Sequence, residues 1–273
     1  MYFWILPGKE KMSLSRFRAI LLEELYVTRH SLEVIMDIVF FPVMNVLVFG
    51  FIAQFLIGST KSNAGNALLA GMILWQIVYI VQYSMSVSSL WNIWSRNLSN
   101  IFITPISLKE YLGAHMLSGL LKAIISFIFF GLISIYIFNF NIFNLGIINL
   151  TLFFINLTLF SWSTGIIILG VIFRFGTRIQ ALAWGLIFLF QPLTAALFPV
   201  RILPHILQLL AYLLPPTFVF EAARNSLAKP GVNWEMFFIA VIENIVYFML
   251  TIAFFNYMFK KAKDTGQFAR NEG

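Results

Sequence analysis

The sequence contains no cysteine and few charged residues. Without cysteine there is no disulfide framework, no thiolate metal ligand and no thiol nucleophile. Only 11% of the 273 residues are charged, whereas 60% are hydrophobic and the mean hydropathy is +0.88. Soluble domains carry about 25% charged residues. The composition therefore excludes an ordinary soluble domain and predicts a chain that is mostly surrounded by lipid.

Sequence motifs for chemistry are missing as well. Residues 58–62, GSTKS, lack the Gly-x4-Gly-Lys spacing of a phosphate-binding loop. No GxSxG elbow of a hydrolase occurs. The three histidines, His30, His115 and His205, are scattered and do not have the spacing of a metal site. We therefore expect no catalytic residue, ATPase site, cofactor site or metal site in this chain.

Six stretches are long and apolar enough to span a membrane, for which roughly 20 residues are needed. They are residues 35–57, 67–87, 117–138, 145–173, 179–200 and 236–259. Backbone that is exposed to lipid must be helical. We therefore predict an all-α integral membrane protein with a single transmembrane domain over residues 1–273. It comprises a cytoplasmic amphipathic segment (1–32), a six-span bundle (35–259) and a cytoplasmic tail (260–273).

The positions of Lys and Arg in the short connections predict the orientation of these spans. Thirteen of them, including Lys9, Lys11 and Arg270, lie on the side of the two termini. Four lie on the other side: Lys61, Arg201, Arg224 and Lys229. Cytoplasmic connections carry the excess of basic residues. We therefore expect a multi-pass protein of the plasma (inner) membrane with both termini in the cytoplasm, and we read the net charge of +7 as a topology signal rather than as a nucleic-acid site.

Residues 13–30 predict an amphipathic helix on the cytoplasmic surface. One face is expected to carry the apolar residues Leu14, Phe17, Leu21 and Leu25, and the other directions the charged residues Arg16, Glu23, Glu24 and Arg29. Two interpretations stay open for this helix. It is either an anchor before the first span or a docking surface for a partner, and periodicity does not separate them.

The connection between the second and third spans, residues 88–115, is longer than a return loop needs. Trp91 and Trp94 lie one helical step apart and are followed by Arg96 and Ile101. Pro105 disfavours helical geometry at Thr104. Ser107 and Glu110 then form a capping-box pattern that starts a new helix. We therefore predict a short cytoplasmic helix, a break and a new helix; a partner contact is favoured here, with an interfacial helix on lipid headgroups as the alternative.

The segment between the last two spans is apolar but interrupted by proline. Five of the nine prolines fall between Pro192 and Pro216. Pro199 and Pro204 break the chain around Arg201, and the Pro215–Pro216 pair ends a short helix and starts another. Backbone that enters the membrane without crossing it persists only where protein or a cavity surrounds it. We expect short re-entrant helices that form a lid or vestibule at the outer end of a pathway.

Three charges inside the predicted spans are functional candidates because charged groups are rare in lipid. Asp37 lies near the inner end of the first span, where water is within reach. Lys122 is close enough to the cytoplasmic end of the third span to extend toward water. Glu243 lies about 12 Å along the last span from Glu235. It is expected to pair with Arg201 or Arg224, or to face the pathway.

Two segments give a resemblance to a known family. NIFITPISLKEYLGAH, residues 100–115, and LFPVRILPHILQLLAYLLPPTFVFEAAR, residues 197–224, resemble segments of the permease subunits of ABC-2 type (type V) ABC exporters. The order of amphipathic helix, spans and re-entrant pair is also similar over nearly the whole chain. The chain has Arg96 where such permeases often have an acidic residue.

The resemblance implies a dimer with a second permease copy or a paralogue, and a separate cytoplasmic ABC ATPase that binds ATP and Mg²⁺. It implies two groups of site residues. The ATPase-coupling candidates are Trp91, Trp94, Arg96, Ile101, Thr104 and Pro105. The outer-gate candidates are Pro199, Arg201, Pro204, Pro215, Pro216, Glu221 and Arg224.

The resemblance favours an exporter permease for an amphipathic, lipid-like or lipid-linked glycan substrate, and no residue chooses among these substrates. The alternatives from other classes are a stand-alone secondary transporter or channel that uses Glu243 or Asp37, and an intramembrane enzyme. The transporter or channel would carry flux in liposomes that contain this chain alone. The enzyme would turn over without ATP.

Overall fold

The computed structural model describes residues 12–60 and 63–266, and most of them are helical. Within these residues, five helices are long and apolar enough to cross a membrane. A sixth crossing is counted if the bent pair α9 and α10 is one broken span. This confirms the prediction of an all-α multi-pass membrane protein. Four basic residues used to predict orientation, Lys9, Lys11, Lys61 and Arg270, lie outside the described residues.

Five helices form the body of the bundle. They are α3 (Phe41–Thr60), α4 (Ala64–Trp94), α6 (Leu108–Phe138), α7 (Ile147–Phe175) and α11 (Trp234–Asp264). α1 (Leu14–His30), α2 (Leu32–Ile35) and a π-helical segment (Met36–Phe40) precede α3. The other helices are α5 (Leu98–Ile103), α8 (Ala181–Leu193), α9 (His205–Ala211) and α10 (Pro215–Ala228). Three 3-10 turns, Ile142–Leu145, Gly176–Ile179 and Val200–Ile202, precede α7, α8 and α9.

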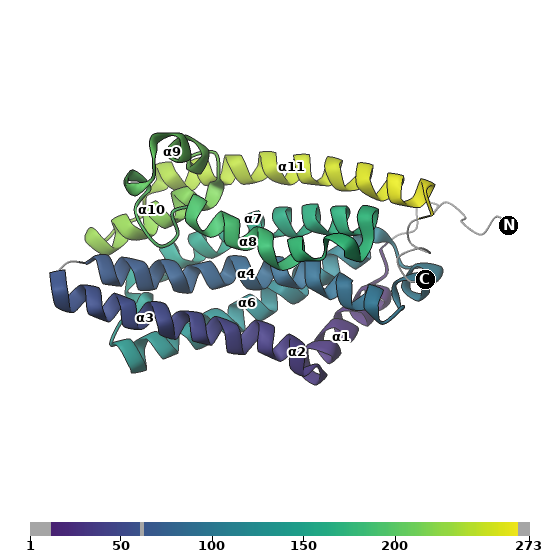
Figure 1. The fold of residues 1–273 in the computed structure, drawn as a ribbon, viewed down its shortest axis with the longest axis horizontal. Coiled ribbons are helices and arrows are strands. Elements are labelled where there is room, and N and C mark those ends of the chain that lie inside the picture. Colours follow the sequence, from purple (N-terminus) through teal and green to yellow (C-terminus); the bar gives the residue numbers. More distant parts are fainter. Residues whose placement is uncertain (1–11, 61–62, 267–273) are drawn as a thin grey trace.

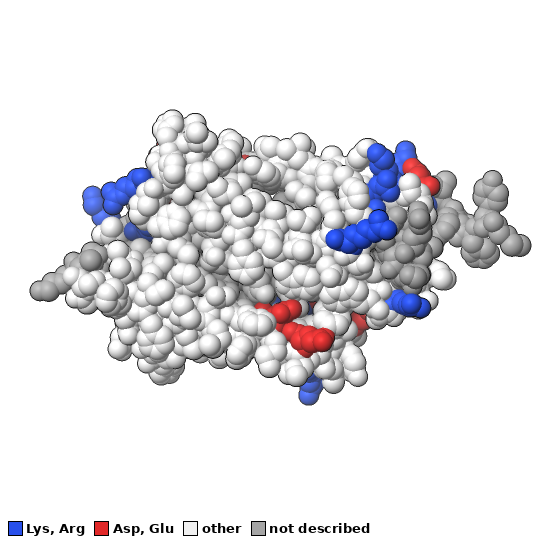
Figure 2. All heavy atoms as spheres, in the orientation of Figure 1, with Lys and Arg blue, Asp and Glu red and all other residues white. Residues whose placement is uncertain are grey.

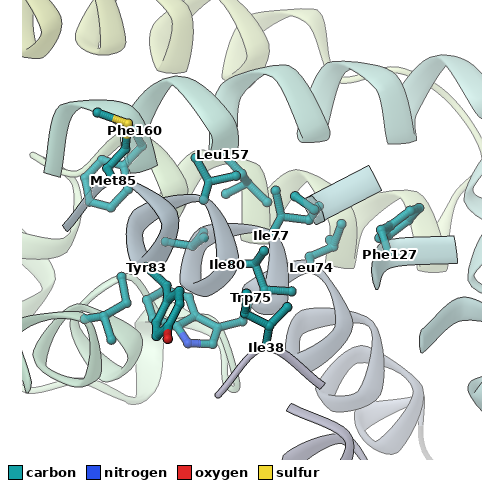
Figure 3. Packing of buried hydrophobic residues seen from close by; sticks show 14 of the residues in the cluster. Ile38, Leu74, Trp75, Ile77, Ile80, Tyr83, Met85, Phe127, Leu157 and Phe160 are labelled. Atoms are coloured by element: carbon teal, nitrogen blue, oxygen red, sulfur yellow. The ribbon is translucent and has the colours of Figure 1, made fainter. Parts of the chain in front are cut away.

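α4 is the central helix of the bundle and packs against α3, α6 and α7 (Figure 1). In its most apolar stretch, 83% of the residues are buried, against 22% in the α2–α3 span and 17% in α11. Figure 3 shows Ile77 and Ile80 of α4 among Leu157 and Phe160 of α7 and Phe127 of α6. α3 and α11 are therefore outer helices, with apolar faces left for lipid.

The two ends of the bundle differ in what they carry (Figure 1). α1 and the C-terminal turn of α11 lie at one end, which we call the α1 end. α9 and α10 lie toward the opposite end, which we call the re-entrant end. Figure 2 shows basic side chains at both ends of the visible face and acidic side chains over the α2 region. α1 and the C-terminal turn of α11 therefore share one end of the bundle, whereas the side of the membrane on which the two termini lie stays a prediction.

The structure corrects two predicted boundaries. α4 continues to Trp94, so Trp91 and Trp94 end the second span instead of forming a separate helix; the separate helix is α5. The predicted fifth span, residues 179–200, holds only the 13-residue helix α8. At 1.5 Å per residue this helix is about 20 Å long, shorter than the roughly 30 Å of a hydrocarbon core. It ends at Thr194 because Ala195 adopts a left-handed backbone conformation with φ of 53°.

Candidate functional site

The Glu110 carboxylate ties three segments together at the α1 end. Ser107 caps α6, and the Ser107 backbone N–H donates to Glu110 at 2.7 Å, which confirms the predicted capping box. The same carboxylate accepts from the backbone N–H of Ser13 at 2.6 Å and from the Arg16 guanidinium at 3.1 Å. A cap of α6 is therefore also the attachment point of α1. Hydrogen bonds to an ionised carboxylate such as this one are stronger than hydrogen bonds between two neutral groups.

A buried charge cluster attaches α1 a second time. Glu24 accepts from the Lys122 ammonium at 2.5 Å and from the Ser88 hydroxyl at 2.6 Å, and His115 Nδ1 lies 3.6 Å from its other oxygen. Burial tends to raise the pKa of Glu24, but the charge of Lys122 and the hydrogen bonds from Lys122 and Ser88 hold it below its ordinary value. Glu24 is therefore an ionised carboxylate that links α1 to α4 and α6.

This cluster corrects two predictions. Lys122 does not extend toward water, because its side chain is only 6% exposed and is paired with Glu24. The expected charged side of the amphipathic helix is also partly wrong, because Glu24 is buried. Of the expected apolar residues, Phe17 and Leu21 pack against the core, whereas Leu14 is exposed. The face of α1 that touches the protein thus carries apolar residues and one buried charge.

A third contact joins α1 to the turn between α4 and α5. The Asn97 side-chain amide donates to the Glu23 carboxylate at 3.1 Å. Burial and the neighbouring Glu24 charge raise the pKa of Glu23, and the bond from Asn97 opposes this rise. We call the contacts Arg16–Glu110, Glu24–Lys122 and Glu23–Asn97 the α1 clamp. Sequence reasoning missed the clamp because nothing in one sequence pairs residues that are so far apart along it.

The predicted ATPase-coupling residues fall into two groups. Trp91 and Trp94 are in edge-to-face contact, with ring centroids 5.1 Å apart, and Trp94 stacks on Trp184 of α8 at 6.0 Å. Ile101 is buried in the core. The exposed members are Trp94, Arg96, Thr104 and Pro105. The surface that a partner can reach therefore lies around α5, where Ile103 exposes 76% of its side chain.

At the re-entrant end, α9 and α10 meet at an angle of 98° and the motif residues hold the loop before them. Glu221 accepts from the backbone N–H of Val200 at 2.8 Å. Arg224 donates to the Ala195 carbonyl at 2.8 Å and to Glu221 at 3.0 Å. Glu221 and Arg224 thus fix residues 195–200 from one turn of α10. We call residues 195–224 the re-entrant segment.

The other predicted gate residues shape this segment. Pro199 and Pro204 flank the 3-10 turn Val200–Ile202, and Pro204 and Arg201 are exposed. Pro215 and Pro216 are buried in the first turn of α10, where proline is tolerated because its missing N–H has no partner there anyway.

One glycine lets the re-entrant segment approach α4 closely. A Cβ atom on Gly71 would lie 2.0 Å from the Ala196 carbonyl oxygen, a distance that real atoms do not adopt. The obstacle is backbone, which cannot rotate away as a side chain does. The loop before α9 therefore rests directly on the α4 backbone.

The other two charged residues of the predicted spans, Asp37 and Glu243, have different surroundings. Asp37, in the π-helical segment, accepts a hydrogen bond from the Tyr83 hydroxyl at 2.9 Å. Glu243 does not pair as predicted: Arg224 binds Glu221 instead, and among the described residues Glu243 has no ion pair and its buried Oε2 has no hydrogen-bond partner. The structure therefore brings neither Arg201 nor Arg224 to Glu243.

An aromatic row winds along α4 and was missed from the sequence. Trp75, Tyr79, Tyr83 and Trp91 recur at multiples of four residues, and each four-residue step turns about 40° further around a helix of 3.6 residues per turn. The ring of Trp75 lies 6.2 Å from that of Phe220 in α10, so the row starts beneath the re-entrant segment. Trp91 ends it at the α1 end. Between Leu68 and Leu90, only Tyr79 is partly exposed. The spacing itself was the signal that could have found it.

These features define a multi-pass membrane protein with a polar clamp at one end and a re-entrant segment at the other. The family described as ABC-2 type transporter matches residues 18–228, and this stretch includes the whole re-entrant segment and all residues of the clamp except Arg16. The chain therefore belongs to the ABC-2 type transporter family and is a transmembrane permease subunit of that kind. A comparison with curated proteins found no match.

Proposed function

We propose that this permease exports an amphipathic, lipid-like or lipid-linked substrate, driven by ATP that a separate cytoplasmic ABC subunit binds with Mg²⁺ and hydrolyses. Two permeases, identical or related, would form the pathway. The α1 end would face the cytoplasm and the re-entrant end the outside of the plasma membrane. This orientation rests on the basic residues counted in the sequence.

The observation that carries the proposal is the α1 clamp. Because Glu110 binds Ser13, Arg16 and Ser107 together, a displacement of the α5–α6 junction must also displace α1. Because Glu24 binds Lys122, the displaced α1 pulls on α6 a further three helical turns along. A partner that pushes the exposed surface around Ile103 would thus move α1 and the whole span α6, and not one loop.

The re-entrant segment supports the other half of the proposal. Its helices are short and bent, and the large apolar side chains of α9 are exposed, among them Ile206 and Leu209. Its loop rests on Gly71 of α4, the helix that continues to Trp94 at the other end. A movement of α4 would therefore reach the loop directly. We expect the segment to seal the outer exit in the resting state.

The test uses two exposed isoleucines at opposite ends, Ile103 (76% exposed) and Ile206 (74% exposed). With the ABC ATPase co-expressed, Ile103→Ser should weaken co-purification and substrate-stimulated ATP hydrolysis roughly tenfold, as loss of an interface anchor does. Ile206→Ser is the matched control and should leave co-purification unchanged. Equal behaviour of the two variants would contradict docking at α5. Flux through liposomes that contain only this chain, without ATP, would favour a secondary transporter or channel.

A further inference from the structure

The Asp37 carboxylate belongs to a candidate membrane span and forms no ion pair with any other described residue. Asp37 is the sixth residue of the span Leu32–Ser59, about 8 Å from its start at 1.5 Å per residue. Its described contact is the hydrogen bond from Tyr83, and among the described residues no Lys, Arg or His forms an ion pair with it. An ionisable residue at this depth is costly and is usually kept for a function.

The backbone at Asp37 is also unusual. Met36–Phe40 is π-helical, and such segments are rare and are often found at functional sites. One extra residue per turn rotates the side chains that precede it relative to those that follow. Here Ile38 is buried, whereas Phe40 and Phe41 stay exposed, and Asp37 reaches the Tyr83 hydroxyl of α4. The irregular turn therefore holds the carboxylate against the aromatic row.

Further aromatic rings continue from Tyr83, whose hydroxyl donates to this carboxylate. Tyr79, one turn from Tyr83, has its ring centroid 6.1 Å from that of Tyr83 and 6.4 Å from that of Phe188 in α8. Tyr79 is partly exposed and Phe188 exposes 53% of its side chain. On the face shown in Figure 2, acidic side chains are exposed over the α2 region beside α4.

The charge and the aromatic rings of these residues favour one chemical class of ligand. A carboxylate attracts a cation, and the faces of tyrosine and phenylalanine rings carry negative partial charge that does the same. The Tyr83 hydroxyl is already used by Asp37, so few polar groups are left for a sugar, which needs many hydrogen bonds. An anionic ligand would be repelled. We propose that Asp37, Tyr79 and Phe188 form a binding site for a lipophilic organic cation that arrives from the inner leaflet. This inference rests on the proposed function, because it names the substrate class of the same permease.

The experiment uses two probes of the same shape and opposite charge, tetraphenylphosphonium and tetraphenylborate. Binding of each is measured by equilibrium dialysis to the full chain in nanodiscs of zwitterionic lipid, after subtraction of empty nanodiscs. We expect saturable binding of the phosphonium and none of the borate. Asp37→Asn should weaken phosphonium binding roughly tenfold, the effect of one cation contact in a desolvated place. Glu33→Gln, which removes an exposed carboxylate four residues away, is the matched control and should bind normally.

A second pair of variants tests the rings independently of the carboxylate. Tyr79→Phe keeps the aromatic face and should bind the phosphonium as the wild type does, whereas Tyr79→Ala should weaken binding. This pair decides the question if Asp37→Asn does not fold. Equal binding of the two probes, or normal binding by both Asp37→Asn and Tyr79→Ala, would overturn the site. Because no ATPase is needed, that result would leave docking at α5 untouched, and loss of docking alone would leave the cation site standing.

Discussion

The contacts at the two ends of the molecule differ in how far along the chain they reach. At the α1 end, Arg16 and Glu110 are 94 residues apart and Glu24 and Lys122 are 98 apart. At the re-entrant end, Val200 and Glu221 are 21 residues apart, and Ala195 and Arg224 are 29 apart. The hydrogen bonds of the α1 clamp thus join distant parts of the bundle, whereas those of Glu221 and Arg224 stay within the re-entrant segment, which packs on α4, α7 and α11.

This difference indicates how each end can move. An element that is held by local bonds can shift as a unit while the long helices stay packed. An element that is held by ion pairs to two other helices moves only with those helices. The re-entrant segment is therefore suited to open and close as a gate. The α1 clamp is suited to transmit a movement rigidly to the helices that it joins. The predictions that follow separate these two roles.

The largest effect is expected at Glu24. Glu24→Ala leaves the Lys122 ammonium buried without its carboxylate, and the loss of one partner from a buried ion pair costs about 3–5 kcal/mol of the free energy of unfolding. Unfolding in mixed micelles measures it. Adding Lys122→Met to Glu24→Ala should restore part of the loss, because the orphaned charge is then gone. A loss no greater than that of Glu33→Ala, whose side chain is exposed, would contradict the buried pair.

A smaller and more local effect is expected at Gly71. Gly71→Ala forces the Ala196 carbonyl away from α4 and should cost about 1–3 kcal/mol, the range found for overpacked interiors. The matched control is Gly185→Ala, where an added Cβ meets nothing within 4 Å. Because the chain has no cysteine, a single Ile206→Cys reports the change through its rate of thiol labelling. The rate should rise with Gly71→Ala and not with Gly185→Ala. No rise in either would show that the loop does not rest on α4.

The smallest effect is the dependence of stability on pH at the α1 end. The pKa of Glu24 is lower in the folded chain than in the unfolded chain, so its contribution is complete above the ordinary pKa of glutamate, about 4.3. It is lost as the pH falls through the lowered value. The melting temperature should therefore decline below about pH 4 more steeply in the wild type than in Glu24→Gln. Parallel curves would mean that Glu24 is not ionised in the folded chain.

The sequence predicts some of these features and not others, for physical reasons. Local signals succeeded: the helix over residues 13–30 and the capping box of Ser107 and Glu110 depend on neighbours in the chain. The burial of Glu24 could not be predicted, because a helix on a membrane surface can meet protein on one side and lipid headgroups on the other. Apolar residues such as Leu14 suit the second environment as well as the first. Apolar periodicity therefore does not tell which face meets the protein.

Prediction from the sequence is limited for a similar reason in other parts of the chain. Hydropathy counts residues 179–200 as a span, but it does not register the turn at Ala195 that stops α8 after 13 residues. It also does not register the π-helical segment that orients Asp37. The motif residues Glu221 and Arg224 were found by resemblance, and only the structure shows that they hold backbone groups of residues 195–200.

The central claim is that α1 and α5 move together when the partner ATPase binds ATP. Because the chain has no native cysteine, a spin label can be attached to a cysteine introduced at a chosen position. Suitable positions are Leu22, Ile206 and Asn100 of α5, because all three residues are exposed. Distances between label pairs are measured in the assembled complex with and without ATP. The account predicts an unchanged Leu22–Asn100 distance and a changed Asn100–Ile206 distance. A changed Leu22–Asn100 distance with a constant Asn100–Ile206 distance would contradict it.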